Sequence, residues 1–198
     1  MLVACRSEPS SVGGEDAARL AEPGPSPSVT GSGPNPMPVR PGSLPTAATV
    51  VVPRQLRIAS ISVTARVTEV GIDPATNDFA VPPSVDVVGW YKFGPGLEAT
   101  AGSVVIAGHV DSAEEGKGAF FRLRELNPGD LIEVAGSDGA RRTFTVVARE
   151  EWAKTRIPLD RYFSRDGAPR LTLITCGGPF DARERSYRDN IVVTAVPA

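Results

Sequence analysis

From Arg54 to the C-terminus, the chain is a succession of short apolar or alternating runs separated by turns rich in glycine, proline and aspartate. Residues 56–67 alternate apolar with polar side chains, as half-buried strands do, and residues 190–196 form another strand-like run. The runs 131–134 and 143–147 flank Ser-Asp-Gly at 137–139, which indicates a hairpin. Short helices are favoured only at 119–126 and near Leu159. This pattern predicts a mostly β domain, either a barrel or a sandwich.

The first 53 residues have a different composition. Prolines recur among serines and glycines, and no aromatic residue occurs before Pro53. Such a segment has too little apolar surface to form a core of its own. We therefore predict that residues 1–53 form a disordered tether and that residues 54–198 form the folded, catalytic domain. Removing residues 1–53 should then leave both the fold and the activity in vitro intact.

Near the N-terminus, residues 2–5 (Leu-Val-Ala-Cys) have the form of a bacterial lipoprotein processing site. No long apolar run precedes Cys5, so the chain as written carries no signal peptide. One interpretation is that translation starts upstream and that a membrane segment belongs there. The alternatives are a chance cysteine in a disordered tail and a disulfide between Cys5 and Cys176.

The near balance of charge and the absence of known binding motifs exclude several classes of function. The 21 basic residues nearly balance the 23 acidic residues, so no basic surface for nucleic acid is expected. The Gly-Gly pair at 177–178 lacks the residues of a phosphate-binding loop. One histidine and one cysteine in the folded region cannot supply a zinc site. The sequence therefore predicts neither a cofactor nor a metal.

Cys176 and His109 occupy similar places in the pattern. Cys176 ends the apolar run 171–175, and the following Gly-Gly-Pro indicates that this strand stops there. His109, the only histidine, follows the run 104–107. The ordinary interpretations are a buried cysteine and a structural histidine. Because both residues terminate strands, we instead predict a nucleophile and its acid/base.

An acyl-transfer site also needs a donor for the oxyanion that develops in the transition state. Arg188 opens the last strand, twelve residues after Cys176 (188 − 176 = 12), so the two residues should lie at one end of the domain. Arg183 and Arg185 belong to the intervening loop and are expected to be solvated. We therefore predict Arg188 as the third catalytic residue.

Three motifs make the chain resemble a known family. Residues 172–176 (Thr-Leu-Ile-Thr-Cys) match the Thr-Leu-x-Thr-Cys signature of sortases, the cysteine transpeptidases of Gram-positive surfaces. Residues 108–112 (Gly-His-Val-Asp-Ser), 175–181 (Thr-Cys-Gly-Gly-Pro-Phe-Asp) and 187–193 (Tyr-Arg-Asp-Asn-Ile-Val-Val) resemble the class F branch. The similarity extends from about Arg54 to the C-terminus.

This resemblance implies a closed eight-stranded β-barrel with one or two short helices, in which Cys176 is the nucleophile, His109 the acid/base and Arg188 the oxyanion stabiliser. It implies cleavage of a Leu-Pro-x-Thr-Gly-like sorting signal after Thr, with a thioester on Cys176. The acceptor would be an amine of a peptidoglycan precursor or of another surface protein. The enzyme would work outside the cytoplasm, anchored at the outer face of the cell membrane, with its N-terminus near that membrane. No residues of a calcium site can be identified.

Two other functions share many of these residues. A hydrolytic cysteine peptidase would use the same site but accept water in place of an amine. A non-catalytic extracytoplasmic β-barrel that binds a ligand would contain an inert cysteine. The His-Gly and Ser-x-Gly-Cys signatures of L,D-transpeptidases are absent from the sequence.

Overall fold

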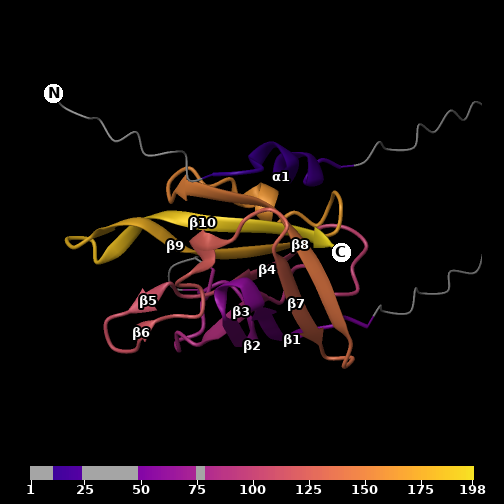
Figure 1. Ribbon diagram of the computed structural model, residues 1–198, viewed down its shortest axis with the longest axis horizontal. Helices are drawn as coiled ribbons and strands as arrows, with labels where there is room; N and C mark the ends of the chain where they lie inside the picture. Colours follow the sequence, from indigo (N-terminus) through magenta and orange to yellow (C-terminus); the bar gives the residue numbers. More distant parts are fainter. Residues whose placement is uncertain (1–10, 24–48, 75–78) are drawn as a thin grey trace, which may run out of the picture.

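The computed structural model describes residues 11–23, 49–74 and 79–198. Its main body is a closed barrel of eight strands in the order β1-β2-β3-β4-β9-β10-β8-β7, with β7 pairing back to β1 (Figure 1). The barrel strands are β1 (Pro53–Ile58), β2 (Val63–Val70), β3 (Val87–Tyr91), β4 (Ser103–Ala107), β7 (Leu131–Gly136), β8 (Arg141–Ala153), β9 (Arg170–Asp181) and β10 (Ser186–Pro197). The predicted eight-stranded closed barrel is confirmed.

The remaining elements are short. They are the helices α1 (Gly14–Leu20) and α2 (Leu159–Tyr162), the 3-10 turns η1 (Ala59–Ile61) and η2 (Leu123–Glu125), and the hairpin strands β5 (Asp111–Ser112) and β6 (Gly116–Lys117). The helix predicted near Leu159 is confirmed, whereas the helix predicted over 119–126 is wrong except for η2. The backbone N–H groups of Phe121, Leu123 and Leu126 donate to carbonyls three residues earlier, not four, so this segment forms 3-10 turns rather than an α-helix.

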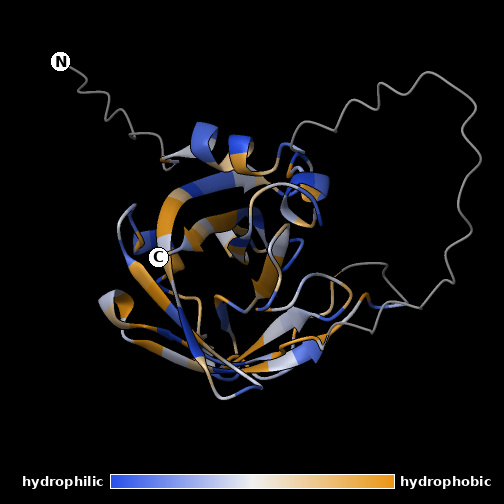
Figure 2. Cartoon of the chain, turned by 90° about the vertical axis from the view of Figure 1, so that its right-hand side faces the viewer, coloured by the Kyte–Doolittle hydropathy of each residue, from blue (hydrophilic) through white to orange (hydrophobic). Residues whose placement is uncertain are grey.

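Apolar and polar residues alternate along the strands, and the apolar side chains fill the interior of the barrel. Buried and partly exposed residues alternate along β7 and through most of β8, and Figure 2 shows hydrophobic and hydrophilic bands following one another along the strands. The apolar core includes the fully buried side chains of Leu56, Trp90 and Phe120. β4 is buried at every position, which accounts for its uninterrupted apolar run.

The parallel pairing of β4 with β9 positions the candidate site. Ala107 is the register partner of Ile174, and His109 and Cys176 each follow two residues later. Because side chains in strands alternate with a period of two, an in-register parallel pair carries both residues past the same end of the barrel. The backbone N–H of Gly108 donates to Ile174 at 3.1 Å and continues this pairing to the residue before His109.

β9 does not stop at Cys176, which corrects the sequence prediction. It continues through the glycines to Asp181, and Gly177 and Phe180 pair with Asp189 and Tyr187 of β10. The strand can continue here because glycine has no Cβ, and neighbouring side chains occupy the space that a Cβ at either position would need. A Cβ at Gly177 would lie 2.6 Å from Ile191 Cγ1, and Gly178 has a φ of 71°. The glycines therefore make room for side chains of β10.

The expectation of disorder over residues 1–53 is wrong for residues 11–23. These residues form α1 and its flanking turns, and α1 lies outside the barrel against β8 (Figure 1). Ala17 is buried, with 3% of its surface exposed. Residues 1–10 and 24–48, including the processing-site motif at 2–5 and the proposed Cys5 disulfide, lie outside the described residues.

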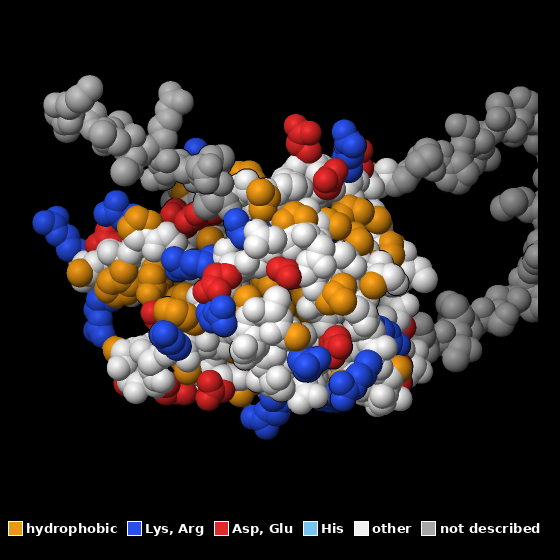
Figure 3. All heavy atoms as spheres, in the orientation of Figure 1, with side chains coloured by type: hydrophobic (Ala, Val, Ile, Leu, Met, Phe, Trp, Pro, Cys, Tyr) orange, Lys and Arg blue, Asp and Glu red, His pale blue; other side chains and the backbone are white. Residues whose placement is uncertain are grey.

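The surface carries mixed charge. Lysine and arginine side chains are interspersed with aspartate and glutamate over the face shown in Figure 3. This distribution agrees with the near balance of charge in the sequence. Among the residues that the structure describes, no helix has the length and apolar character needed to cross a bilayer.

Candidate active site

His109 is fixed through both its backbone and its ring. Its carbonyl accepts a hydrogen bond from Phe120 N–H at 3.1 Å, and its Nε2 lies 2.9 Å from the carbonyl oxygen of Pro82. A carbonyl oxygen can only accept, so Nε2 carries a hydrogen and donates it. Nδ1 is then the ring nitrogen available to exchange a proton with another group.

Cys176 is a free thiol, half-buried on β9. The preceding residue, Thr175, turns its side chain toward β4, where its Oγ1 donates to the carbonyl of Gly108 at 2.8 Å. Thr175 adjoins the cysteine and Gly108 adjoins His109. This buried side-chain hydrogen bond therefore adds to the backbone bond from Gly108 N–H to Ile174 in linking the segments that carry the two predicted catalytic side chains.

His109 and Cys176 both line an apolar groove of about 390 Å³. One wall comes from the ends of β4 and β9, and the facing wall comes from the loop between β8 and β9, which contains α2. The apolar side chains of this groove are Phe79, Val81, Ala107, Ile157, Leu159, Phe163 and Ile174. Lys154 adds the one cation among its lining residues, so the groove suits an extended, largely apolar peptide segment.

The same two residues also line a second, polar groove of about 270 Å³. Asp111, Glu114 and Arg185 contribute charged side chains to it. Tyr187 O–H donates to Asp111 Oδ2 at 2.6 Å and joins the β9–β10 hairpin to the segment after His109. This hydrogen bond raises the pKa of Tyr187. The Cys176–His109 pair thus faces two grooves of different character.

Arg188 is not part of either groove in this structure. It is the residue at which the pairing of β10 with β9 shifts register, and its side chain is 67% exposed. Its Nη2 pairs with Asp181 Oδ2 at 2.9 Å, and this hydrogen bond lowers the pKa of Asp181. The structure therefore brings Cys176 and His109 together and holds Arg188 at the base of the adjoining hairpin tip.

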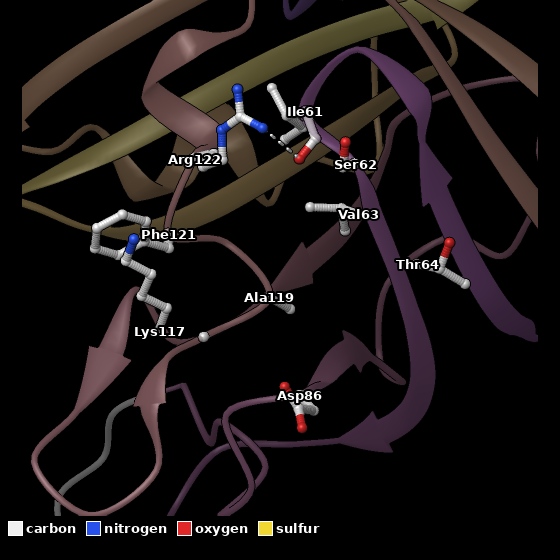
Figure 4. Close-up of a pocket in the computed structure, with 10 residues that line it drawn as sticks. Ile61, Ser62, Val63, Thr64, Asp86, Lys117, Ala119, Phe121 and Arg122 are labelled. Atoms are coloured by element: carbon white, nitrogen blue, oxygen red, sulfur yellow. Dashed lines mark hydrogen bonds between the residues drawn. The ribbon is translucent and has the colours of Figure 1, made fainter.

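A separate pocket of about 420 Å³ is shown in Figure 4. It is bounded by the η1 turn and the segment from Lys117 to Arg122, and Arg122 donates to the carbonyl of Ile61 there. Neither Cys176 nor His109 lines it. Its size therefore does not make it the candidate active site.

The sequence analysis missed the roles of four residues in the site. Pro82 was not singled out, whereas its carbonyl orients His109. Thr175 was noted as part of a motif but not as a hydrogen-bond donor across strands. Tyr187 and Asp111 lie in the motifs at 187–193 and 108–112. Their places near Arg188 and His109 in the sequence were the only signal that they belong to the site, where they form a hydrogen bond.

Comparisons with known proteins agree with this fold. The family model described as the sortase domain matches residues 56–198. Sortase A from Corynebacterium diphtheriae (a lid mutant) superposes with a TM-score of 0.55 at 21% identity, covering 78% of this chain and 74% of that one. Sortase C-1 from Actinomyces oris gives a TM-score of 0.55 at 20% identity, covering 73% and 72%. No curated protein matches the sequence.

The structural neighbours share too little sequence to indicate more than the fold. The family match carries the assignment, because it spans all eight barrel strands except the first residues of β1. The chain therefore belongs to the sortase family of cysteine transpeptidases.

Proposed function

We propose that this chain is a class F sortase that cleaves a Leu-Pro-x-Thr-Gly-like signal after Thr and transfers the acyl group to an amine. The observation that carries the proposal is that Cys176 and His109 face two grooves at once. A transpeptidase needs room for an acyl donor and for a separate acceptor. The apolar groove fits the donor peptide, and the polar groove, with Asp111 and Glu114, fits an amine.

The reaction begins with the thiolate of Cys176 and the imidazolium of His109. The sulfur attacks the Thr carbonyl carbon, and a C–S bond forms as the C–N bond to Gly breaks. The leaving amine takes a proton from Nδ1 of His109, because Nε2 is engaged with Pro82. The acceptor amine then returns a proton to Nδ1, attacks the thioester and releases Cys176 as the thiolate.

Arg188 is proposed to stabilise the oxyanion in both steps. Its present partner, Asp181, forms an exposed ion pair with it, and such pairs contribute little to stability. The side chain can therefore exchange Asp181 for the developing charge on the substrate. Arg185 already lines the polar groove and is the alternative donor.

Residues 54–198 are proposed to be the catalytic domain. Sortases act at the cell surface on proteins that carry sorting signals. We accordingly propose that this domain works at the outer face of the membrane, with surface proteins as acyl donors and a peptidoglycan precursor or another surface protein as acceptor.

Incubation with a Leu-Pro-x-Thr-Gly peptide and triglycine tests the function. Mass spectrometry should detect an acyl adduct on Cys176 and a ligated product that increases with triglycine at the expense of the hydrolysed acid. Cys176→Ala and His109→Ala should abolish both products. Hydrolysis that does not respond to triglycine would assign the chain to the peptidases. The absence of an adduct on an accessible thiol would contradict both functions.

A further inference from the structure

The N-terminal segment, residues 11–23, covers an edge of the barrel. β7 pairs with β8 only as far as Thr145, and the N-terminal segment takes over farther along the same strand. Val12 and Arg149 exchange two backbone hydrogen bonds, at 2.7 and 2.8 Å. The backbone N–H of Glu151 donates to Ser11 Oγ at 2.9 Å. The segment thus forms a single β-bridge with β8 before α1 begins.

Two glycines show that the N-terminal segment packs closely against the backbone of β8 and of the β8–β9 loop. Gly13 has a φ of 72°, and a Cβ there would lie 2.1 Å from the carbonyl oxygen of Val147. Gly167, in the β8–β9 loop, has a φ of 82°, and its Cβ would lie 2.3 Å from the carbonyl oxygen of Leu20. A side chain at either position would separate α1 from the barrel. The segment and the loop are therefore complementary at both ends of α1.

Beneath the first turn of α1 lies Glu150, which is only 4% exposed. A Cβ at Gly14 would lie 3.0 Å from its Oε1, so the helix backbone covers the carboxylate closely. Glu150 accepts a hydrogen bond from Tyr162 O–H at 2.8 Å and pairs with Arg161. Both partners belong to α2. The first turn of α1 thus covers the buried ion pair that attaches α2 to β8.

The last residue of α1 holds the other end of the same loop. The carbonyl of Leu20 accepts hydrogen bonds from Ala168 N–H at 2.9 Å and from Arg170 Nη1 at 3.2 Å. Arg170 Nη2 in turn donates to the carbonyl of Arg161 at 3.0 Å. α1 therefore contacts the loop near its return to β9 and, through Arg170, at α2.

The loop presents different residues to α1 and to the apolar groove. Arg161, Tyr162 and Gly167 face β8 and α1, whereas Leu159 and Phe163 line the groove with Cys176. Leu159 and Phe163 are held at their positions by the short helix between them, which is itself attached through Glu150. The N-terminal segment thus contacts the same loop that provides Leu159 and Phe163 to the wall of the apolar groove.

We propose that residues 11–23 are a positioning element for the donor side of the active site. They hold the β8–β9 loop in the conformation that binds the sorting signal, and they do not touch the reacting atoms. This inference rests on the proposed function for the identity of the ligand. Undocking α1 should weaken binding of the signal peptide and leave the reactivity of Cys176 unchanged, because β4 and β9 fix Cys176 and His109 independently.

The test compares two glutamates in the full chain. Ala17→Glu places a charge at a buried position of α1, whereas Arg19→Glu places the same side chain at an exposed position of the same helix. If undocking leaves a tenth of the molecules with an ordered loop, the KM for the Leu-Pro-x-Thr-Gly peptide rises about tenfold. The kcat and the rate of Cys176 alkylation by iodoacetamide should stay unchanged in both variants.

Hydrogen exchange provides a readout that needs no substrate. The amides of Ala168 and Arg149 should exchange faster in Ala17→Glu and remain protected in Arg19→Glu, because Leu20 and Val12 are their acceptors. Gly13→Ala should reproduce the effects of Ala17→Glu from the other end of the segment, and Ala17→Ser should behave as wild type.

Three results would overturn the inference. Faster exchange with an unchanged KM would show that the loop does not need α1 to bind peptide. Unchanged exchange would show that α1 does not hold the loop. Parallel loss of kcat and thiol reactivity, or failure of Ala17→Glu and Gly13→Ala to fold, would indicate a general structural role. A wild-type chain without any acyl adduct would instead contradict the proposed function, while the exchange data would still test the docking.

Discussion

Replacing Thr175 by Val removes one hydroxyl from the connection between the two predicted catalytic residues. Thr175 Oγ1 donates to the Gly108 carbonyl at 2.8 Å, and Thr175 is 4% exposed. Val has nearly the same shape, so the substitution deletes a hydrogen bond without opening a cavity. It leaves a carbonyl beside His109 without this donor, and it releases a constraint on the backbone beside Cys176.

The expected cost follows from these contacts. Losing a buried hydrogen bond and leaving one partner unsatisfied costs about 1–3 kcal/mol. A loss of about 2 kcal/mol lowers the melting temperature of a domain of this size by about 4–8 °C. The effect on the rate should be larger, because a displacement of about 1 Å between reacting groups can cost about 10²-fold.

Thr172→Val is a matched control on the same two strands. Thr172 Oγ1 lies 2.7 Å from Ser103 Oγ, in the core and away from Cys176. Both variants should show a similar drop in melting temperature by circular dichroism. Only Thr175→Val should lose turnover in the peptide and triglycine assay. Equal activity in the two variants, whether retained or lost, would refute the role assigned to the Thr175–Gly108 hydrogen bond.

Three further outcomes are expected. Arg188→Lys should lower kcat by about 10²–10³-fold with little change in melting temperature, because an ammonium cannot replace a planar guanidinium as an oxyanion donor; near-normal turnover would favour Arg185. Burial, reinforced by the hydrogen bond to Glu150, raises the pKa of Tyr162 above its ordinary value near 10. Its contribution to stability is then complete below about pH 10 and is lost as the pH rises toward the raised pKa, so Tyr162→Phe should flatten the alkaline loss of stability in urea titrations. Cys176 should react with iodoacetamide in the native protein; protection until unfolding would indicate an inert core cysteine.

Local patterns in the sequence were sufficient to predict most of the strands. The β7–β8 hairpin follows from Ser-Asp-Gly at 137–139, where Gly139 adopts a φ of 78° that a side chain would disfavour. The strands preceding His109 and Cys176 were evident because their apolar runs are bounded by polar residues or glycines. These features depend on neighbours in sequence, which a single chain displays directly.

Features that depend on distant contacts were not predictable in the same way. The parallel pairing of β4 with β9 joins residues far apart in the chain, and from the residues themselves the sequence showed only that His109 and Cys176 each follow an apolar run. The extension of β9 to Asp181 depends on β10 pairing with it. The apolar spacing at 119–126 favoured a helix, but the segment is tied at its start to the carbonyls of Val85 and His109 and continues in 3-10 turns.

The N-terminal segment shows how an average over 53 residues conceals a short ordered piece. Residues 10–22 contain no proline, and Glu15 and Asp16 precede Arg19 in the order that favours a helix dipole. An isolated helix of this length is unstable in water. Its order depends on Gly13 and Ala17 fitting against β8, which the composition of the segment could not reveal.

The position of Arg188 in the sequence is not sufficient to assign its role. The oxyanion role proposed for Arg188 concerns charge that exists only in the transition state and its intermediates, whereas its guanidinium pairs here with the carboxylate of Asp181. Asp181 ends β9 and Arg188 lies at the register shift of β10, so the pair also defines the base of the hairpin tip. Recruiting Arg188 to the substrate therefore requires the tip to lose this contact. The donor peptide and the hairpin tip are then coupled, although the apolar groove contains neither residue.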